Sequence, residues 1–210
     1  MTLAAAITAL AVCALLAAEW RDLRLGVWIA KPVASLGFVT FALLGGALES
    51  GYGRYIVVGM CLCALGDVLL IPRANGKLFL VGIGGFALGH VAYAAAFYAR
   101  DPLLGPSAIA GAIMALIVAL ALRWLGPHLP ADMRVPVRVY MLVIAAMVAL
   151  SVGASAATGE LGIGIGAAAF AASDLSVARE RFVRPNLVNL LWGLPLYYTA
   201  QLVLASTSAA

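Results

Sequence analysis

Apolar residues run in long blocks along this chain, and nearly all charged residues lie between the blocks. A transmembrane helix needs about 20 mainly apolar residues, with a range of about 17–25, and eight blocks reach that length. We therefore predict an all-α membrane protein that is one polytopic transmembrane domain. The predicted helices lie at about 2–18, 26–48, 55–72, 78–99, 103–122, 137–157, 161–178 and 187–206. The connections are short, and the longest, 123–136, is at most a surface loop.

The composition agrees with this pattern. The 210 residues are 65% hydrophobic and 10% charged, whereas soluble domains are about 45–50% apolar and about 25% charged. A soluble globular protein is excluded. No basic segment precedes the first apolar block, so we interpret that block as a membrane span rather than a cleaved signal.

The basic residues predict the orientation in the membrane. Only Arg54 and Arg100 lie in connections on one side. The other side carries Arg21, Arg24, Arg73, Lys77, Arg123, Arg134, Arg138, Arg179, Arg181 and Arg184. Because cytoplasmic loops are rich in Lys and Arg, we expect this second side in the cytoplasm and both termini outside an inner or plasma membrane. The excess of basic residues behind the net charge of +4 is thus explained by membrane topology, and we expect no nucleic-acid partner.

Two carboxyl groups lie inside apolar segments, Asp67 in Ala64-Leu65-Gly66-Asp67-Val68 and Asp174 in Ala172-Ser173-Asp174-Leu175. An acid inside the membrane costs roughly 2.5–3.5 kcal/mol on insertion scales, which makes it a candidate functional residue. At 1.5 Å per helical residue, both lie about 8 Å or less from the cytoplasmic ends of their helices. We predict an active site in the cytoplasmic half of the membrane. The alternatives are a buried structural hydrogen bond for Asp67 and a pair with Arg179 or Arg181 for Asp174.

One face of the fourth predicted helix carries Phe86, His90 and Tyr93 at spacings of three and four residues. His90 is a candidate site residue, or alternatively a hydrogen-bonded packing residue. Gly85 and Gly89 form a small-xxx-small pair that favours close approach of another helix.

The last predicted helix carries a polar stripe, Asn189, Gly193, Tyr197 and Gln201, at four-residue spacing. Such a stripe is explained equally well by ligand binding and by interhelical hydrogen bonds.

Lys31 precedes Pro32, a pattern that predicts a helix beginning at Pro32 and Lys31 in a non-helical turn. The Lys31 side chain either extends to the membrane interface or faces a lipid phosphate.

A weak internal repeat relates the two halves of the chain. An offset of 107 residues matches Asp67 with Asp174, Lys31 with Arg138 and His90 with Tyr197. Two parallel four-helix repeats would produce this match, and chance is the alternative explanation.

No cofactor or metal is indicated. Cys13, Cys61 and Cys63 lie in apolar segments without partner ligands at suitable spacing, and we interpret them as small core residues.

Several short motifs occur in order along the chain: Lys31-Pro32, Gly66-Asp67, Gly82…Phe86…His90…Tyr93, Phe170-x-x-Ser173-Asp174 with Arg181-Phe182, and Tyr198-x-x-Gln201. Together they resemble the lysoplasmalogenase-like (YhhN) family of integral membrane proteins, over the second to eighth predicted helices. The resemblance implies eight membrane spans and hydrolysis of the vinyl-ether bond of lysoplasmalogens. The products would be a fatty aldehyde and glycerophospho-ethanolamine or -choline, and the partners would be a lysophospholipid and bilayer lipids.

Vinyl-ether hydrolysis needs a general acid, a carboxylate and a group that holds the head group. Our hypothesis makes Asp67 the protonated donor, Asp174 the base, and His90 the residue that positions water or relays the proton. The residues expected to bind substrate are Lys31, Ser173, Tyr93, Asn186, Asn189, Tyr198 and Gln201, with Lys31 and one of the two asparagines on the phosphate. The alternatives are a proton-coupled transporter or lipid translocator, and a structural or assembly protein.

Overall fold

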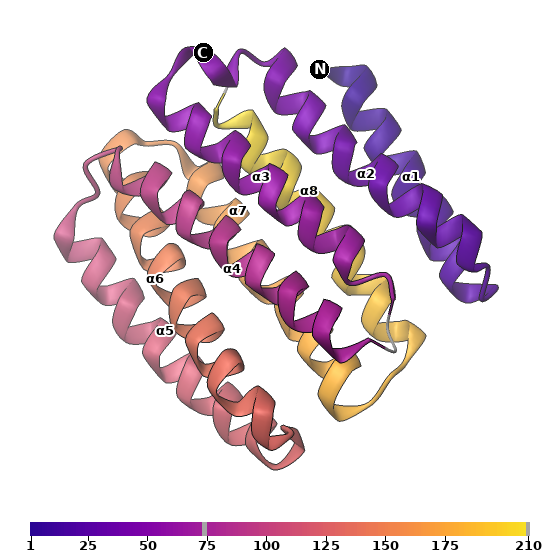
Figure 1. Cartoon of the computed structure of the whole chain (residues 1–210). Coiled ribbons are helices and arrows are strands. Elements are labelled where there is room, and N and C mark those ends of the chain that lie inside the picture. Colours follow the sequence, from indigo (N-terminus) through magenta and orange to yellow (C-terminus); the bar gives the residue numbers. More distant parts are fainter. Residues whose placement is uncertain (73–74, 209–210) are drawn as a thin grey trace.

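The structure is a computed structural model that describes residues 1–72 and 75–208, and in this part eight long helices form a bundle (Figure 1). All eight are long and apolar enough to cross a membrane. They are α1 (Thr2–Trp20), α2 (Arg24–Leu44), α3 (Gly51–Leu69), α4 (Gly76–Tyr98), α5 (Leu104–Leu125), α6 (Arg134–Thr158), α7 (Leu161–Ala178) and α8 (Leu187–Ser206).

The predicted all-α fold is confirmed, and the last two helices match their predicted bounds. The expected loop at 123–136 is shorter, because α5 continues to Leu125 and α6 begins at Arg134. Two 3₁₀ turns, η2 (Gly126–His128) and η3 (Ala131–Met133), join them. A 3₁₀ turn η1 (Ala47–Glu49) precedes α3, and a π-helical turn η4 (Arg179–Val183) follows α7. Arg73, one of the residues that predict the orientation, lies outside the described residues.

Side chains with short polar groups begin several helices. Ser50 accepts a hydrogen bond from the Gly53 backbone N–H at the start of α3, and Asn75 and Asn186 do the same for α4 and α8. These caps satisfy amides that have no partner within the helix. Gly159, with a φ of 77°, ends α6 in the left-handed conformation that glycine adopts without strain.

The prediction that a helix begins at Pro32 is wrong. Pro32 lies inside α2, which begins at Arg24, and Lys31 is helical. Proline is tolerated within membrane helices because neighbouring helices satisfy the backbone groups that it leaves free or displaces. The Lys31 carbonyl lies within hydrogen-bond distance of two hydroxyl groups, Ser35 Oγ at 3.1 Å and Tyr198 OH at 3.4 Å.

Glycines bring α3 and α4 into close contact, as the Gly85 and Gly89 pair predicts. A Cβ atom at Gly89 would meet Cys63 Sγ at 2.6 Å, and one at Gly85 would meet the Leu62 carbonyl at 3.3 Å. The hydrogen side chains therefore let the two backbones approach closely enough to place α4 side chains beside the end of α3.

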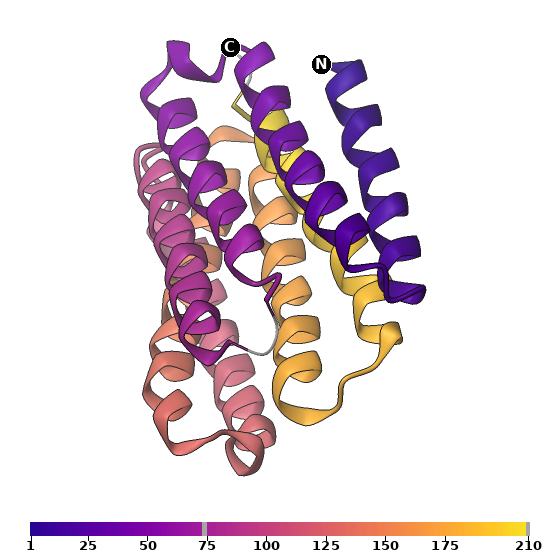
Figure 2. The same cartoon turned by 45° about the vertical axis from the view of Figure 1, so that its right-hand side comes forward.

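The helices alternate in direction, so α1 begins and α8 finishes on the same side of the bundle (Figure 2). The connections after α1, α3, α5 and α7 lie at the opposite end (Figures 1 and 2). Within each half, consecutive helices pack together, and the halves meet where α4 packs on α6 and α2 packs on α8. These two contacts are equivalent under a four-helix shift. The packing of α1 on α8 also joins the halves and has no α4–α5 equivalent of similar size among the described residues, so the internal repeat stays a prediction.

Candidate active site

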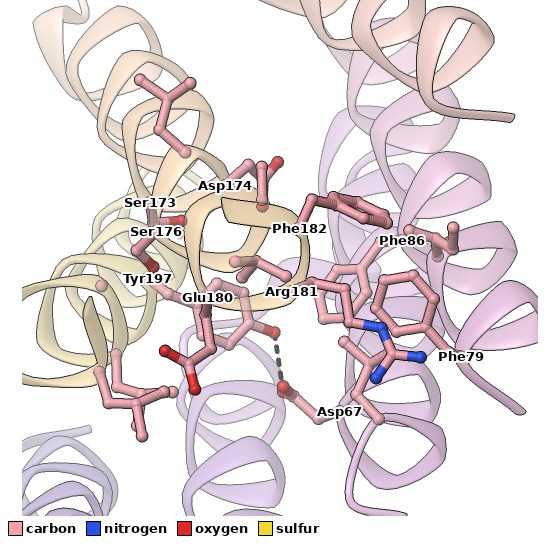
Figure 3. Close-up of a pocket in the computed structure, with 18 of the residues that line it drawn as sticks. Asp67, Phe79, Phe86, Ser173, Asp174, Ser176, Glu180, Arg181, Phe182 and Tyr197 are labelled. Carbon is pink, nitrogen blue, oxygen red and sulfur yellow. Dashed lines mark hydrogen bonds between the residues drawn. The ribbon is translucent and has the colours of Figure 1, made fainter. Parts of the chain in front are cut away.

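Asp67 lies near the end of α3 and its side chain is 4% exposed. Ser35 Oγ and Tyr197 OH donate hydrogen bonds to Oδ2 at 2.7 and 2.8 Å. Lys31 Nζ lies 3.4 Å from Oδ1. All these neighbours donate hydrogen bonds or carry positive charge, so this environment stabilises the ionised carboxylate. Figure 3 shows the bond to Tyr197.

A chain of hydrogen bonds with one direction ends on Asp67. Tyr93 OH donates to Gln201 Oε1 at 2.6 Å, Gln201 Nε2 donates to Tyr197 OH at 3.2 Å, and Tyr197 OH donates to the carboxylate. The Tyr197 hydroxyl has one proton, and the amide donor of Gln201 leaves it free for Asp67. The chain thus links α4, α8 and α3 and holds Tyr197 as a donor.

Asp174, one turn before the end of α7, has different neighbours. Its side chain is 14% exposed, Tyr140 OH donates to Oδ2 at 3.1 Å, and His90 Nε2 lies 3.5 Å from the same oxygen. That separation is longer than an ordinary hydrogen bond, and Nε2 has no hydrogen-bond partner among the described residues. The two groups are a polar contact in position to share a proton.

A backbone contact shows which ring nitrogen of His90 carries a proton. His90 Nδ1 lies 2.6 Å from the Phe86 carbonyl oxygen, which can only accept, so Nδ1 carries a proton. In neutral imidazole the nitrogen that faces Asp174 is then an acceptor. A proton on Asp174 would therefore face an acceptor nitrogen of His90, 3.5 Å away.

Aromatic rings enclose both carboxyl groups. The His90 ring centroid is 4.5 Å from that of Phe170 and 5.5 Å from that of Tyr140. Phe86 packs edge-on against Tyr197 at 5.8 Å and against Phe170 at 6.3 Å. Because these rings keep the surroundings apolar, charge–charge interactions at the site are stronger than in water.

Both carboxyl groups line one cavity of about 1430 Å³ (Figure 3). Drug-sized ligand pockets hold about 300–1,000 Å³, so this space is large enough for a lipid. The end of the cavity at the helix connections is charged. Its lining there includes Glu19, Asp22, Arg24, Lys77, Asp132, Glu180 and Arg181. We call this end the charged mouth.

The predicted site residues divide into three groups. Asp67, Asp174, Lys31 and Ser173 line the cavity. The Ser173 hydroxyl donates to the Phe170 carbonyl at 2.6 Å. Lys31 does not extend to the interface, because its ammonium group pairs with Asp67.

A second group lies directly behind the lining: His90, Tyr93, Tyr198 and Gln201. Tyr93 and Gln201 belong to the hydrogen-bond chain, and His90 reaches Asp174. The Tyr198 hydroxyl lies 3.3 Å from Ser35 Oγ. None of the four is part of the cavity lining, and their predicted roles at the substrate stay predictions.

The two asparagines have structural contacts instead. Asn186 caps α8, and Asn189 Nδ2 donates to Glu180 Oε2 at 2.8 Å and to the Arg184 carbonyl at 2.9 Å. Neither residue is part of the cavity lining. Their contacts fasten the turn between α7 and α8 and do not support the expected phosphate role.

Sequence reasoning missed three residues of the site: Ser35, Tyr140 and Tyr197. Tyr197 carried two signals, because it lies on the polar stripe of the last helix and matches His90 under the offset. Tyr140 and Ser35 lie in apolar helices that also carry other polar residues, and only the fold brings them to the acids.

The offset of 107 residues also relates the contacts of the two acids. It converts Asp67 into Asp174, and His90 into Tyr197. Asp67 contacts Tyr197, and Asp174 contacts His90. His90 and Tyr197 are thus matching positions of the two halves, and each of them contacts the acid of the half to which it does not belong.

These features define a class: a polytopic helical membrane protein with one buried and one partly buried carboxyl group in a lipid-sized cavity. The chain belongs to the YhhN family, whose family model matches residues 26–208.

Three relatives illustrate the similarity. Lysoplasmalogenase TMEM86A of Bos taurus is 34% identical over 168 residues, which cover 77% of this chain and 68% of the relative. Lysoplasmalogenase of Mycobacterium tuberculosis (strain CDC 1551 / Oshkosh) is 34% identical over 137 residues, 63% of this chain and 52% of the relative. Lysoplasmalogenase TMEM86B of Sus scrofa is 28% identical over 184 residues, 85% and 74% of the two chains.

The match thus spans about half the length of the mycobacterial relative. No solved structure matches the chain. The transporter alternative receives no support from these relatives, since all three names describe a hydrolase.

Proposed function

We propose that this protein is an intramembrane hydrolase that cleaves the vinyl-ether bond of lysoplasmalogens. The observation that carries the proposal is one cavity with two carboxyl groups in contrasting surroundings, Asp67 beside a cation and hydroxyl donors, and Asp174 beside His90. Membership of the YhhN family and the names of the relatives support the substrate.

The reaction consumes one water molecule and needs no redox partner. The bond between the alkenyl carbon C1 and the glycerol oxygen breaks, and the products are a fatty aldehyde and a glycerophospho-alcohol. The first barrier is protonation of the alkenyl carbon C2, which leaves an oxocarbenium ion at C1. An acid that holds a proton and a carboxylate that stays ionised are therefore both needed.

The contacts favour Asp174 as the acid and Asp67 as the carboxylate, the reverse of the assignment predicted from the sequence. Asp67 accepts from hydroxyl groups and pairs with Lys31, so its charge is balanced. Asp174 Oδ2 lies 3.5 Å from His90 Nε2 in an aromatic environment, without a cation at that distance among the described residues, so a proton on Asp174 is favoured there. After Asp174 gives up its proton, the neighbouring imidazole can help to accept a proton when Asp174 is protonated again at the end of the cycle.

Protons balance over the cycle in this scheme. Asp174 gives its proton to C2, and Asp67 stabilises the oxocarbenium ion. Water adds to C1 and gives a proton to Asp67, which produces a hemiacetal. The hemiacetal hydroxyl then returns a proton to Asp174 while Asp67 protonates the departing glycerol oxygen. Both acids regain their starting states.

The charged mouth holds the head group. The ammonium group of Lys31 is engaged with Asp67, so other cations of the mouth, Arg24 and Lys77 among them, bind the phosphate. The mouth lies at the end of the bundle that carries most of the basic residues. By the positive-inside rule the site opens toward the cytoplasmic half of an inner or plasma membrane, and both termini lie outside.

Isotope labelling tests the chemistry directly. Purified protein in detergent, given a 1-alkenyl-lysophosphoethanolamine in D₂O, should release aldehyde with one deuterium on the carbon next to the carbonyl group. Asp67→Asn and Asp174→Asn should each abolish release, while both variants still insert and elute as the wild type does. Normal turnover in either variant would contradict the scheme. Cleavage of only the ester-linked analogue would show a different reaction.

A further inference from the structure

The cavity continues past the carboxyl groups on one side of the bundle. There its lining is apolar and comes from three helices, α5, α6 and α7. The residues are Met114, Ile117, Ile144, Val148, Ala168 and Ala171. We call this part of the cavity the chain lobe.

Helix geometry gives the depth of the lobe. On α7, Ala168 lies six residues before Asp174 in the sequence, which places it about 9 Å farther from the charged mouth along the helix. On α6, Val148 lies eight residues beyond Tyr140, which is about 12 Å. The lobe therefore extends from the level of Asp174 well into the apolar part of the bundle.

The other side of the cavity ends differently. On α2, α3 and α8 the deepest lining residues are the polar Lys31, Asp67 and Tyr197. Directly behind them the fully buried Phe38 packs against the rings of Tyr197 and Tyr198, with centroids 6.2 and 6.0 Å apart. Aromatic side chains fill this side, so it offers no apolar space beyond the acids.

The chain lobe also borders the surface that faces lipid. Ile117 on α5 and Leu175 on α7 both line the cavity and are 43% and 39% exposed. Helix α5 packs mainly on α6, which leaves its other side to the membrane. A hydrocarbon chain longer than the lobe can continue into the bilayer from here.

We propose that the chain lobe binds the alkenyl chain of the substrate, and that Ile117 and Ala171 set the chain length that it accepts. This inference rests on the proposed hydrolase function. With the chain in the lobe and the head group at the charged mouth, the vinyl-ether bond lies at the level of the two acids. The substrate then enters sideways from the membrane, between α5 and α7.

Chain-length profiles test the proposal. Ile117→Trp narrows the lobe from α5, and Ala171→Phe narrows it from α7. The control is Leu116→Trp, at the same depth on α5, where the side chain is 62% exposed and is not part of the lining. Activity is compared on hexenyl and hexadecenyl lysophosphoethanolamine in the same mixed micelles, each relative to the wild type.

Both lobe variants should retain activity on the hexenyl substrate, which also shows that they fold. On the hexadecenyl substrate kcat/KM should fall roughly four-fold for each displaced methylene group, or about fifteen-fold for two. Leu116→Trp should keep the wild-type ratio. Equal chain-length profiles for Ile117→Trp and Leu116→Trp would overturn the proposal.

A binding measurement separates this inference from the proposed reaction. A saturated 1-alkyl ether lysolipid with a diazirine at mid-chain cannot be hydrolysed by vinyl-ether chemistry, and its crosslinks should fall on α5, α6 and α7. Crosslinks on these helices without turnover of any vinyl ether would support the chain site and refute the hydrolase. Turnover with crosslinks on α1, α2 or α8 would overturn the chain site alone.

Discussion

Replacement of Lys31 by methionine should destabilise the protein and stop catalysis for the same reason. The substitution keeps the length of the side chain and removes its charge. Lys31 and Asp67 are 13% and 4% exposed as side chains, so water cannot replace the lost ammonium group without rearrangement. The result is a buried carboxylate without its cation.

The distance between the Lys31 ammonium group and the Asp67 carboxylate sets the size of the expected loss of stability. Charges 3.4 Å apart attract by about 5 kcal/mol at an effective dielectric constant of about 20. Removal of one partner from a buried pair typically costs about 3–5 kcal/mol. Asp67 keeps its bonds from Ser35 and Tyr197, so we expect a loss of about 3 kcal/mol. For a chain of this size, that corresponds to a fall in Tm of roughly 6–12 °C.

Thermal unfolding in detergent and aldehyde release measure the two effects separately. Lys31→Arg retains the cation and should keep most of the stability. In the double variant Lys31→Met/Asp67→Asn the unpaired charge is gone, so stability should return to within about 1 kcal/mol of the Asp67→Asn single variant. Activity should stay absent in the double variant.

Retained stability without activity in the Asp67→Asn single variant would show that Asp67 is needed as a carboxylate and not as a packing residue. Wild-type Tm and turnover in Lys31→Met would refute this reasoning, because they would mean that Asp67 needs no cation. An equally large loss of stability in Lys31→Arg would show that the shape of the lysine matters, and not its charge.

Three further substitutions probe other contacts. Tyr197→Phe removes a donor to the α3 carboxylate and should lower kcat/KM by about 10–150-fold, the effect of about 1.5–3 kcal/mol, in steady-state aldehyde release. His90→Phe removes the nitrogen that faces the α7 acid and should lower kcat by about 10²–10⁴-fold with little change in KM, whereas an unchanged kcat would exclude a role in proton transfer. Gly66→Ala brings a Cβ atom to within 2.7 Å of the Phe86 ring and should cost about 1–3 kcal/mol in thermal unfolding. The matched change Gly84→Ala on α4 meets no atom within 4 Å and should leave Tm unchanged or raise it; equal effects of the two would contradict the packing described for α3 and α4.

The membrane helices and the two acids could be predicted because each leaves a local signal. An apolar block of membrane length and a carboxyl group within it are both visible in a short window of sequence. Asp67 and Asp174 stand out for this reason, and both line the cavity. The cap residues Asn75 and Asn186 likewise act on amides two or three residues away.

The partners of the acids could not be predicted in the same way. Tyr197 reaches Asp67 across 130 residues of sequence, and Tyr140 reaches Asp174 from a different helix. Whether a polar residue on an apolar helix faces the cavity, another helix or lipid depends on the rotation of that helix in the bundle. Asn189 shows the same limit, since it lies on the predicted stripe but binds Glu180 instead of facing the cavity.

The reversed acid assignment that we propose has a related cause. From the sequence, Asp67 is the more isolated acid because no arginine lies nearby along the chain. In the fold, α2 brings Lys31 to it. Distance along the sequence is a poor measure of electrostatic surroundings when every helix crosses the whole bundle.

The crossed contacts of the two acids have a consequence for how such a site can arise. Asp67 contacts Tyr197 and Asp174 contacts His90, so neither four-helix half contains a whole site. Two identical halves paired as a symmetric dimer would hold two acids in identical surroundings, so neither acid would be the fixed donor. Once the halves are joined in one chain, each position is free to diverge, and a histidine on one side with a tyrosine on the other makes the acids unequal. A fixed proton donor and a fixed proton acceptor can then share a single cavity, whereas in a symmetric pair the two roles would be interchangeable.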